Sequence, residues 1–407
     1  MTGKLRVALL TREYPPEVYG GAGVHVTYLA RELASLVDLT VHCQGADRPD
    51  AVAHRPWELL AGANQALQVV STDLSMTAAV SSAQLVHSHT WYANLAGHLA
   101  GMLYDIPHVM TMHSLEALRP WKAEQLGGGY AVSTWCERTA AGSAAAVVAV
   151  SDGMRADILA AYPEIPPERV RVIRNGIDTS EYRPDPATDV LDQYGIDKAR
   201  PYVIFVGRIT RQKGVPVLLR AASGLIPEAQ LVLLAGAADT PEQLAEVTEL
   251  VEGLRATRSG VFWIPEMLPR RDVTQLLTHA TVFAIPSVYE PLGIVNLEAM
   301  ACATAVIGSR TGGIPEVVAD GQTGLLVPVG EPEPLAAALN TLVSDPDRAR
   351  AMGQAGRKRA VAEFGWPAIA AQTAALYAEL VNSGLKVKPA VVIRTPVGSS
   401  RRAPPGR

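Results

Sequence analysis

The sequence has 407 residues, more than a single hydrophobic core usually supports, so we expect two domains of about 200 residues each. Hydrophobic residues make up 48% and charged residues 19% of the chain, which excludes a disordered protein and a coiled coil. A net charge of −4 argues against a nucleic-acid-binding protein, and three scattered cysteines indicate neither a disulfide framework nor a zinc site. We therefore expect a protein of the reducing cytoplasm.

Short apolar runs alternate with helical patterns in the first half of the chain. Uninterrupted apolar strands separated by helices are typical of a parallel sheet covered on both faces. The predicted strands span residues 5–10, 39–43, 85–87, 109–112, 145–150 and 170–173.

A glycine-rich turn follows the first predicted strand. Gly20-Gly21-Ala22-Gly23 opens a helix pattern over residues 24–35. Because glycine lets the backbone approach a ligand and a helix N-terminus favours anions, the turn indicates a phosphate or sugar site. A dinucleotide fingerprint is a weaker alternative, since the glycine spacing differs and Cys43 and Gln44 stand where its ribose-binding acid belongs. A tight packing turn is a further alternative.

Polar and aromatic residues follow the strand ends of this half. Trp91 comes just after the strand that ends near His87, and an aromatic ring there could stack on a sugar, although core packing is an equal alternative. We interpret four residues at this edge as contacts to a sugar acceptor: Glu13, Tyr14, His89 and Trp91.

The second half repeats the pattern, with strands predicted at residues 202–206, 231–235, 261–264, 282–285, 305–307 and 324–327. The fold class is therefore α/β, with two Rossmann-like, doubly wound parallel-sheet domains that face each other across a cleft. We place the domains at residues 1–180 and 181–365, with a hinge in the proline-interrupted segment 175–199.

The end of the chain divides into a helix and a tail. A helix is predicted over residues 366–381, crossing back to complete the first domain. Residues 386–407 contain six Lys or Arg and no acid, so we expect a disordered basic tail. No segment has the pattern of a transmembrane helix or a signal peptide, and we expect no integral membrane contact.

Two cations follow the first strand of the second half. Arg208 and Lys213 lie five residues apart on a loop between a strand and a helix. Such a pair can reach one diphosphate from two directions, although loop cations are often merely solvated.

Two carboxylates further along the chain support a functional role for this loop. Glu290 follows the strand at residues 282–285, Gly293 stands where a helix begins, and Glu298 falls about one turn inside that helix. Carboxylates accept hydrogen bonds from vicinal hydroxyls, and free N–H groups at a helix start bind phosphate. The implied ligand is a nucleotide diphosphate sugar.

These motifs, in this order, resemble the retaining GT-B glycosyltransferases of the glycogen-synthase-like family. The resemblance covers residues 5–381 and rests on Glu290-Pro-x-Gly with Glu298, on Gly207-Arg208 with Lys213-Gly214, on Asn175-Gly176-Ile177-Asp178 and on residues 311–316. The run at residues 11–25 is most similar to the short actinobacterial members that act as glycogen synthase or α-maltose-1-phosphate synthase.

The resemblance implies roles for individual residues. Arg208 and Lys213 would bind the donor diphosphate, Glu290 would lie beside the transferred sugar, and Glu298 would hold the ribose diol. Four further positions carry implied roles: the N–H groups of Gly293 and Ile294 on phosphate or sugar, Gly21 beside the diphosphate, and His113 near the C6 hydroxyl of the sugar. Tyr19 departs from the Lys-x-Gly-Gly loop of the long glycogen synthases, which removes a lysine contact to phosphate at that position.

The implied activity is retaining transfer of glucose from ADP-glucose to an α-1,4-glucan or to glucose 1-phosphate. We expect no cofactor and no metal, since the cleft-forming segments contain no Asp-x-Asp motif. Alternatives are transfer from a UDP- or GDP-sugar to a lipid or small molecule, a sugar-nucleotide epimerase, and a nucleotide-sugar-binding regulator. The donor base and the oligomeric state stay open, a homodimer being one option.

Overall fold

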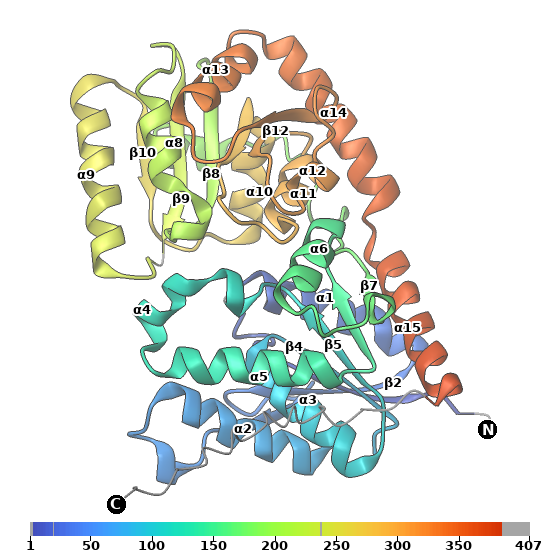
Figure 1. The fold of residues 1–407 in the computed structure, drawn as a ribbon. Coiled ribbons are helices and arrows are strands. Elements are labelled where there is room, and N and C mark those ends of the chain that lie inside the picture. Colours follow the sequence, from blue (N-terminus) through green and yellow to red (C-terminus); the bar gives the residue numbers. More distant parts are fainter. Residues whose placement is uncertain (1–2, 19, 237, 385–407) are drawn as a thin grey trace, which may run out of the picture.

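The computed structural model describes residues 3–18, 20–236 and 238–384, which form two α/β domains (Figure 1). Each domain is built on a parallel sheet with helices on both faces, so the predicted fold class is confirmed. The predicted tail at residues 386–407 lies outside the described residues. No helix of the described ranges is long and apolar enough to cross a membrane.

Within the described residues, seven parallel strands form the first sheet; β4 is its central strand, and β1 lies between β2 and β4. In spatial order the strands are β3 (Val52–His54), β2 (Asp38–Gln44), β1 (Arg6–Leu10), β4 (Leu85–His89), β5 (His108–Met112), β6 (Ala146–Ala149) and β7 (Val170–Val172).

Six parallel strands of the described residues form the second sheet, and β8 lies at its centre between β9 and β11. In spatial order the strands are β10 (Val261–Ile264), β9 (Gln230–Gly236), β8 (Tyr202–Arg208), β11 (Val282–Ile285), β12 (Ala305–Ser309) and β13 (Gly324–Val327).

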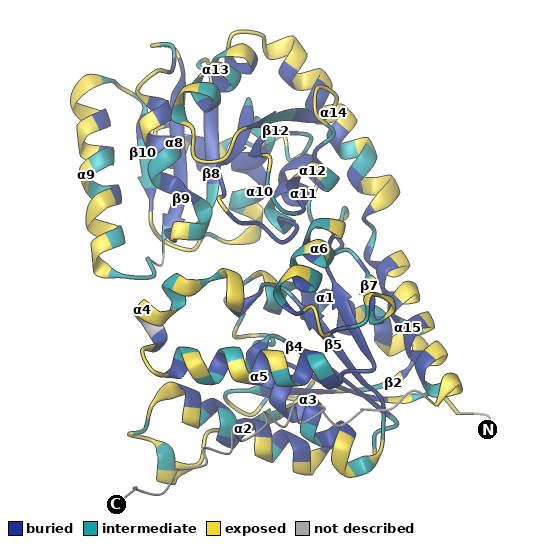
Figure 2. Cartoon of the chain, in the orientation of Figure 1, coloured by how far each residue is buried: buried dark blue, intermediate teal, exposed yellow. Residues whose placement is uncertain are grey.

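Helices connect the strands and cover both sheets, with their outer faces exposed (Figure 2). The α-helices are α1 (Gly21–Leu36), α2 (Gln65–Ala79), α3 (Trp91–Tyr104), α4 (Ala123–Leu126), α5 (Gly129–Ser143), α6 (Asp152–Ala161), α7 (Asp189–Tyr194), α8 (Val215–Ala222), α9 (Pro241–Thr257), α10 (Arg270–His279), α11 (Ile294–Ala301), α12 (Ile314–Val317), α13 (Pro332–Val343), α14 (Pro346–Glu363) and α15 (Trp366–Ser383). Short 3₁₀ turns are η1 (Glu58–Leu60), η2 (Glu116–Leu118), η3 (Pro120–Lys122), η4 (Pro167–Arg169) and η5 (Arg211–Lys213).

Alternate side chains of the central strands enter different cores. Val7 and Leu9 of β1 pack in one cluster, whereas Ala8 and Leu10 pack in another on the opposite face. The period of two follows from the pleat of a strand, and it explains why these strands are apolar throughout. Both faces of each sheet are therefore committed to packing, which leaves the carboxyl ends of the strands for ligands.

The helix α15 belongs to the core of the first domain (Figure 1). Trp366 and Tyr377 are buried in the cluster that contains Val7 and Leu9 of β1, and the Tyr377 hydroxyl lies 2.5 Å from Nδ1 of His87. The last described helix thus packs against the first strand of the chain.

The two domains contact each other directly. The Ser151 hydroxyl at the start of α6 donates to the carbonyl of Pro291 (2.6 Å), and the Gly153 N–H donates to Glu316 of α12 (2.9 Å). A Cβ on Gly153 would lie 2.7 Å from the carbonyl oxygen of Gly312, so only glycine allows this approach. The two domains are therefore closely packed against each other at these strand ends.

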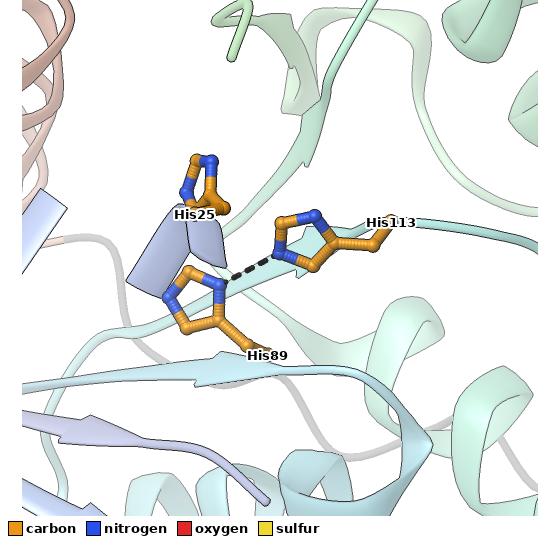
Figure 3. A group of neighbouring side chains, drawn as sticks. All are labelled: His25, His89 and His113. Carbon is orange, nitrogen blue, oxygen red and sulfur yellow. Dashed lines mark hydrogen bonds between the residues drawn. The ribbon is translucent and has the colours of Figure 1, made fainter. Parts of the chain in front are cut away.

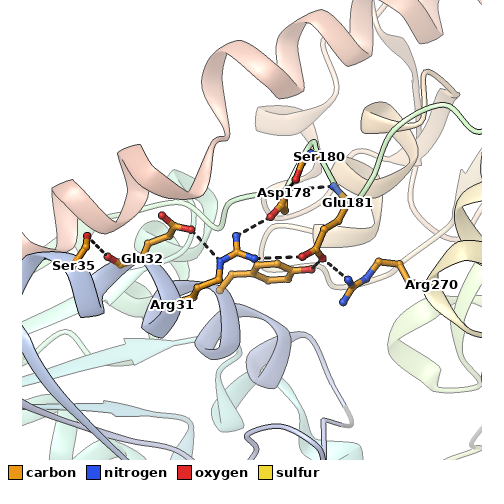
Figure 4. A network of polar contacts seen from close by, with 8 residues as sticks. Arg31, Glu32, Ser35, Asp178, Ser180, Glu181 and Arg270 are labelled. Carbon is orange, nitrogen blue, oxygen red and sulfur yellow. Dashed lines mark hydrogen bonds and ion pairs between the residues drawn. The ribbon is translucent and has the colours of Figure 1, made fainter. Parts of the chain in front are cut away.

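A polar network joins the domains through the segment after β7 (Figure 4). Arg31 of α1 binds Asp178 at 2.7 Å and Glu181 at 3.3 Å. Glu181 also binds Arg270 of α10 in the second domain and accepts a hydrogen bond from Tyr28. The Glu181 carboxylate thus contacts a helix of each domain.

The structure adds to the sequence prediction in two places. The strand β3 was not predicted, because its three residues are too short for a pattern and Val52 is exposed. The helix α1 begins at Gly21, three residues earlier than predicted. Its first three residues, which include two glycines, are helical. The domain limits at residues 180 and 365 stay predictions.

Candidate active site

The cleft edge of the second domain carries a buried ion pair. Lys213 ends the turn η5, whose start is fixed by the Thr210 hydroxyl accepting from the Lys213 N–H at 3.3 Å. The Lys213 ammonium lies 2.6 Å from Oε2 of Glu290, and the Ser287 hydroxyl donates to the same oxygen at 3.0 Å. Both charged side chains are mostly buried, so each depends on the other for charge compensation.

The residue Gly293 shapes the start of α11. Its φ of +89° is in the region that favours glycine, and a Cβ there would lie 2.4 Å from the Asn296 side chain. The N–H groups of the first turn of α11, which begins at Ile294, can therefore receive an anion. Asn296, which the sequence analysis did not single out, is buried here, and neither polar atom of its side chain has a partner in the described part of the chain.

The second carboxylate of the motif lies deeper. Glu298 sits in α11 and is buried, and burial raises the pKa of its carboxyl group. A hydrogen bond with Tyr182, and the charges of Arg270 and Lys213, act in the opposite direction. Tyr182 is the neighbour of Glu181, so the network that joins the domains reaches the carboxylate of the predicted site.

Arg208 ends β8 and pairs with Asp239, whose carboxylate lies 3.1 Å from Nη1. A cavity of about 420 Å³ opens beside this pair, lined by Glu124 of the first domain and by residues of the second. Glu124 and Arg211, which both line the cavity, form an ion pair at 3.2 Å between the two domains. The second-domain lining residues are Arg211, Asp239, Thr240, Pro241 and Glu242.

The glycine turn of the first domain faces the start of α11. A Cβ built on Gly21 would lie 3.8 Å from the Ile294 side chain, so the two predicted donor contacts meet across the cleft. The Gly20 N–H donates to the Glu13 carboxylate at 2.7 Å, and a Cβ on Gly23 would lie 2.6 Å from the same group. The glycines therefore make room for Glu13 at the cleft.

Tyr14 stands next to Glu13 and is half-buried. Its carbonyl oxygen accepts from Arg48 at 2.5 Å, and burial raises the pKa of its phenol. Its backbone is thus fixed, while Tyr19 lies outside the described residues.

Three histidines from distant parts of the chain meet below the cleft (Figure 3). Nδ1 of His89 lies 3.0 Å from Nε2 of His113, and the His25 ring centroid is 4.7 Å from that of His113. Burial lowers the pKa of His25 to about 4 and lowers the pKa of His89 and His113 well below the usual range. The cluster is therefore neutral near pH 7.

The cluster has two consequences for the predicted roles. Because His89 is fully buried and bonded to His113, it is placed to orient that ring and not to reach an acceptor. A nitrogen from each of His25, His89 and His113 lies within 4.8 Å of the others, a grouping that could hold a metal ion. His25 was not predicted as a site residue, because only its position near the start of α1 brings it to the other two histidines.

The structure gives Trp91 a packing role. Its side chain is 3% exposed and packs in a small cluster with Ala66, Val69 and Leu126. A ring enclosed in this way offers no face to a sugar, so core packing, the alternative left open by the sequence, accounts for Trp91.

The comparisons with known proteins agree with this architecture. Residues 19–181 match glycosyltransferase family 4, and residues 188–359 match the family described as glycosyl transferases group 1. The chain is 58% identical over 382 residues to the α-maltose-1-phosphate synthase of Mycolicibacterium smegmatis, which covers 92% of this chain and 99% of that protein.

The chain belongs to glycosyltransferase family 4. Another relative of this glycosyltransferase is the D-inositol 3-phosphate glycosyltransferase of Corynebacterium jeikeium, 34% identical and covering 74% of each chain. Among solved structures, the sucrose-phosphate synthase of Thermosynechococcus elongatus matches with a TM-score of 0.77 and 24% identity, over 93% of this chain and 100% of that one. The two domains of this family-4 enzyme thus have the GT-B arrangement.

Proposed function

We propose that this glycosyltransferase moves a glucosyl unit from ADP-glucose to glucose 1-phosphate, giving α-maltose 1-phosphate, with α-1,4-glucan ends as a second acceptor. The observation that carries the proposal is the 58% identity to an α-maltose-1-phosphate synthase over nearly the whole length of that relative. The configuration at the anomeric carbon is retained.

The donor is held mainly by the second domain. Lys213 and Arg208 offset the charge of the diphosphate, and the N–H groups of Gly293 and Ile294 receive a phosphate oxygen. Glu298 accepts hydrogen bonds from the ribose diol, which a buried carboxylate can do with both oxygens. Gly21 brings the first domain against the diphosphate, since its missing side chain leaves space next to Ile294.

The transferred sugar lies between Glu290 and His113. The bond from Lys213 holds the Glu290 carboxylate in place before the donor arrives. When the diphosphate binds, Lys213 can contact both the leaving phosphate and this carboxylate. His113, neutral and oriented by His89, hydrogen bonds the C6 hydroxyl.

Departure of the nucleotide leaves positive charge on the sugar and negative charge on the phosphate. Arg208, Lys213 and the N–H groups of α11 are fixed before the reaction, and preorganised groups of this kind supply much of the rate enhancement. The acceptor hydroxyl attacks on the face from which the phosphate leaves and passes its proton to the departing phosphate oxygen. No side chain forms a bond to the sugar.

The acceptor lies against the first domain. Glu13, fixed by the glycine turn, and Tyr14 are the proposed contacts. Trp91 and His89 are left out of this set because Trp91 packs in a core cluster and His89 is bonded to His113.

A donor-by-acceptor matrix tests the proposal. ADP-, UDP- and GDP-glucose are each incubated with glucose 1-phosphate and with glycogen, and product masses are measured. The expected main product is a disaccharide monophosphate from ADP-glucose. Consumption of a UDP- or GDP-sugar alone would refute the donor assignment, and an epimer formed without any acceptor would refute transfer.

A second candidate is transfer to another phosphorylated small molecule, which the 34% identity to a D-inositol 3-phosphate glycosyltransferase favours. Adding inositol phosphate to the matrix separates the two. We further propose a cytoplasmic location, supported by three free, buried cysteines. A homodimer stays a prediction.

A further inference from the structure

The three histidines below the cleft come from three separate elements of the first domain. His25 lies in the second turn of α1, His89 is the last residue of β4, and His113 follows β5. One ring nitrogen of each lies within 4.8 Å of the other two, and the rings are turned toward one another (Figure 3). The fold thus gathers three imidazoles, and imidazole is the commonest metal ligand in proteins.

The hydrogen bonds of these rings do not use all of their nitrogens. Neither nitrogen of the buried His25 ring has a hydrogen bond of ordinary geometry to a described residue, and Nε2 of His89 has none either. The Asn175 side chain lies near enough to His25 to oppose the effect of burial on its pKa, but Asn175 Oδ1 is itself unpaired by the same criterion. Buried polar atoms normally have partners, so these nitrogens are available to a ligand.

His87 shows how a histidine with a purely structural role is bonded in the same core. Its Nδ1 lies 2.5 Å from the Tyr377 hydroxyl and its Nε2 lies 2.7 Å from the Thr111 hydroxyl, so both nitrogens are used. The His87 and His89 ring centroids are only 4.2 Å apart. Packing in this core therefore does not by itself leave histidine nitrogens unpaired, and the bonding of His25 is a distinct feature.

The state and spacing of the rings suit a zinc ion. A histidine binds metal through a neutral ring, and burial lowers the pKa of all three histidines. Zinc binds nitrogen at about 2.1 Å, so two nitrogens of a tetrahedral site lie about 3.4 Å apart. Nδ1 of His89 and Nε2 of His113 are 3.0 Å apart, and zinc would replace the hydrogen bond between them. The separations of up to 4.8 Å have to shorten by a rotation of one ring.

The composition of the group favours zinc over magnesium. Magnesium prefers oxygen ligands, whereas this group supplies nitrogen alone. Three protein ligands leave the fourth position of a tetrahedral ion to water. His113 is partly exposed, which gives the ion and the water access from the cleft.

We propose that His25, His89 and His113 form a zinc-binding site and that zinc bound there inhibits sugar transfer. Zinc would take the His113 ring out of the orientation that His89 gives it. It would also put two positive charges beside a sugar that itself becomes positive as the nucleotide leaves, which raises the barrier. The binding site stands without the proposed function, whereas the inhibition rests on it.

Equilibrium dialysis of the metal-free protein against zinc tests the site. We expect one tightly bound zinc ion per chain, measured by atomic absorption. His25→Phe keeps a ring against Trp366 but has no nitrogen, so it should weaken binding at least about tenfold. The matched control is His54→Asn, which removes one ring of another close histidine pair and should bind zinc like the wild type. Equal binding by wild type and His25→Phe, or the same loss in both variants, would overturn the site.

Cobalt spectroscopy gives a readout that needs no variant and therefore holds even if His25→Phe does not fold. Cobalt(II) replaces zinc in nitrogen sites, and its visible absorption is intense in a tetrahedral site and weak in an octahedral one. The wild-type protein should give the intense spectrum at one cobalt ion per chain, and zinc should abolish it. A weak, octahedral spectrum would contradict the three-histidine site.

Initial rates with ADP-glucose and glucose 1-phosphate test the inhibition. Saturating zinc should lower the rate at least about tenfold, EDTA should restore it, and magnesium should have no effect. His25 contacts no substrate in the scheme above, so His25→Phe should keep most of its activity and resist zinc. Zinc that binds without lowering the rate would refute the inhibition. If the metal-free enzyme transfers no glucose, the proposed function fails, and the dialysis and cobalt spectra still decide the site.

Discussion

The two domains differ in how charged side chains are arranged at their strand ends. On the second domain, Lys213 is paired with Glu290 and Arg208 with Asp239, so its charges are compensated before a ligand arrives. On the first domain, the strand ends carry a cluster of three histidines, and burial lowers the pKa of each of them. The comparison suggests that the second domain supplies the charges for a diphosphate and that its ion pairs hold these charges in place before a ligand binds.

The largest expected effect comes from the second domain. Lys213→Ala should lower kcat by roughly 10²–10³, the typical loss for one preorganised group at a developing charge. It also leaves the Glu290 carboxylate buried without its cation. Initial rates at saturating donor measure the effect. Lys198→Ala, an exposed lysine of the same domain, should keep full activity. Equal losses in both variants would contradict a specific role for Lys213.

A smaller effect, confined to donor binding, is expected at Glu298. Glu298→Gln should raise the KM for the donor about tenfold with a lesser change in kcat, because the amide offers one acceptor oxygen in place of two. Burial raises the pKa of Glu298, so the wild-type kcat/KM for the donor should decline as the pH falls through that pKa. The variant should lack this acidic limb, and Glu246→Gln on the surface of α9 should retain it.

The histidine cluster is expected to contribute less. His89→Gln removes the ring that orients His113, so kcat should fall by about three- to tenfold at unchanged donor KM, in line with the loss of one hydrogen bond. A larger rise in donor KM than fall in kcat would show that His89 does not act through His113. Rates at saturating ADP-glucose, with circular dichroism to verify folding, give the answer.

The smallest expected effect is that of a chelator. The charge on the leaving diphosphate is offset by Arg208 and Lys213, so activity should be unchanged after dialysis against EDTA. The three histidines make this a sharp test, because their nitrogens are close enough for a metal ion. Loss of activity on dialysis that zinc restores would contradict this prediction and would place a required metal cation in the first domain.

The second domain's edge could be predicted in detail because its residues are close together in the sequence. Glu290, Gly293 and Glu298 belong to one strand-loop-helix segment, so their spacing alone places the two carboxylates around a helix start. The strands could be predicted equally well, because a strand that is buried on both faces has an unbroken run of hydrophobic residues.

The first domain's edge could be predicted only in outline. His25, His89 and His113 come from three different elements, and a set of this kind is recognisable only when the fold brings the strand ends together. Trp91 shows the converse, since a residue at the right strand end is turned into the core by its packing neighbours.

The position of α15 bears on how the polypeptide matures on the ribosome. The core around β1 includes Trp366 and Tyr377, so residues 6–10 cannot complete their packing until α15 has been synthesised. Domains generally fold in the order in which they emerge, but here the second domain can finish before the first. Until α15 has emerged from the ribosome, the first domain exposes an apolar surface to which chaperones could bind.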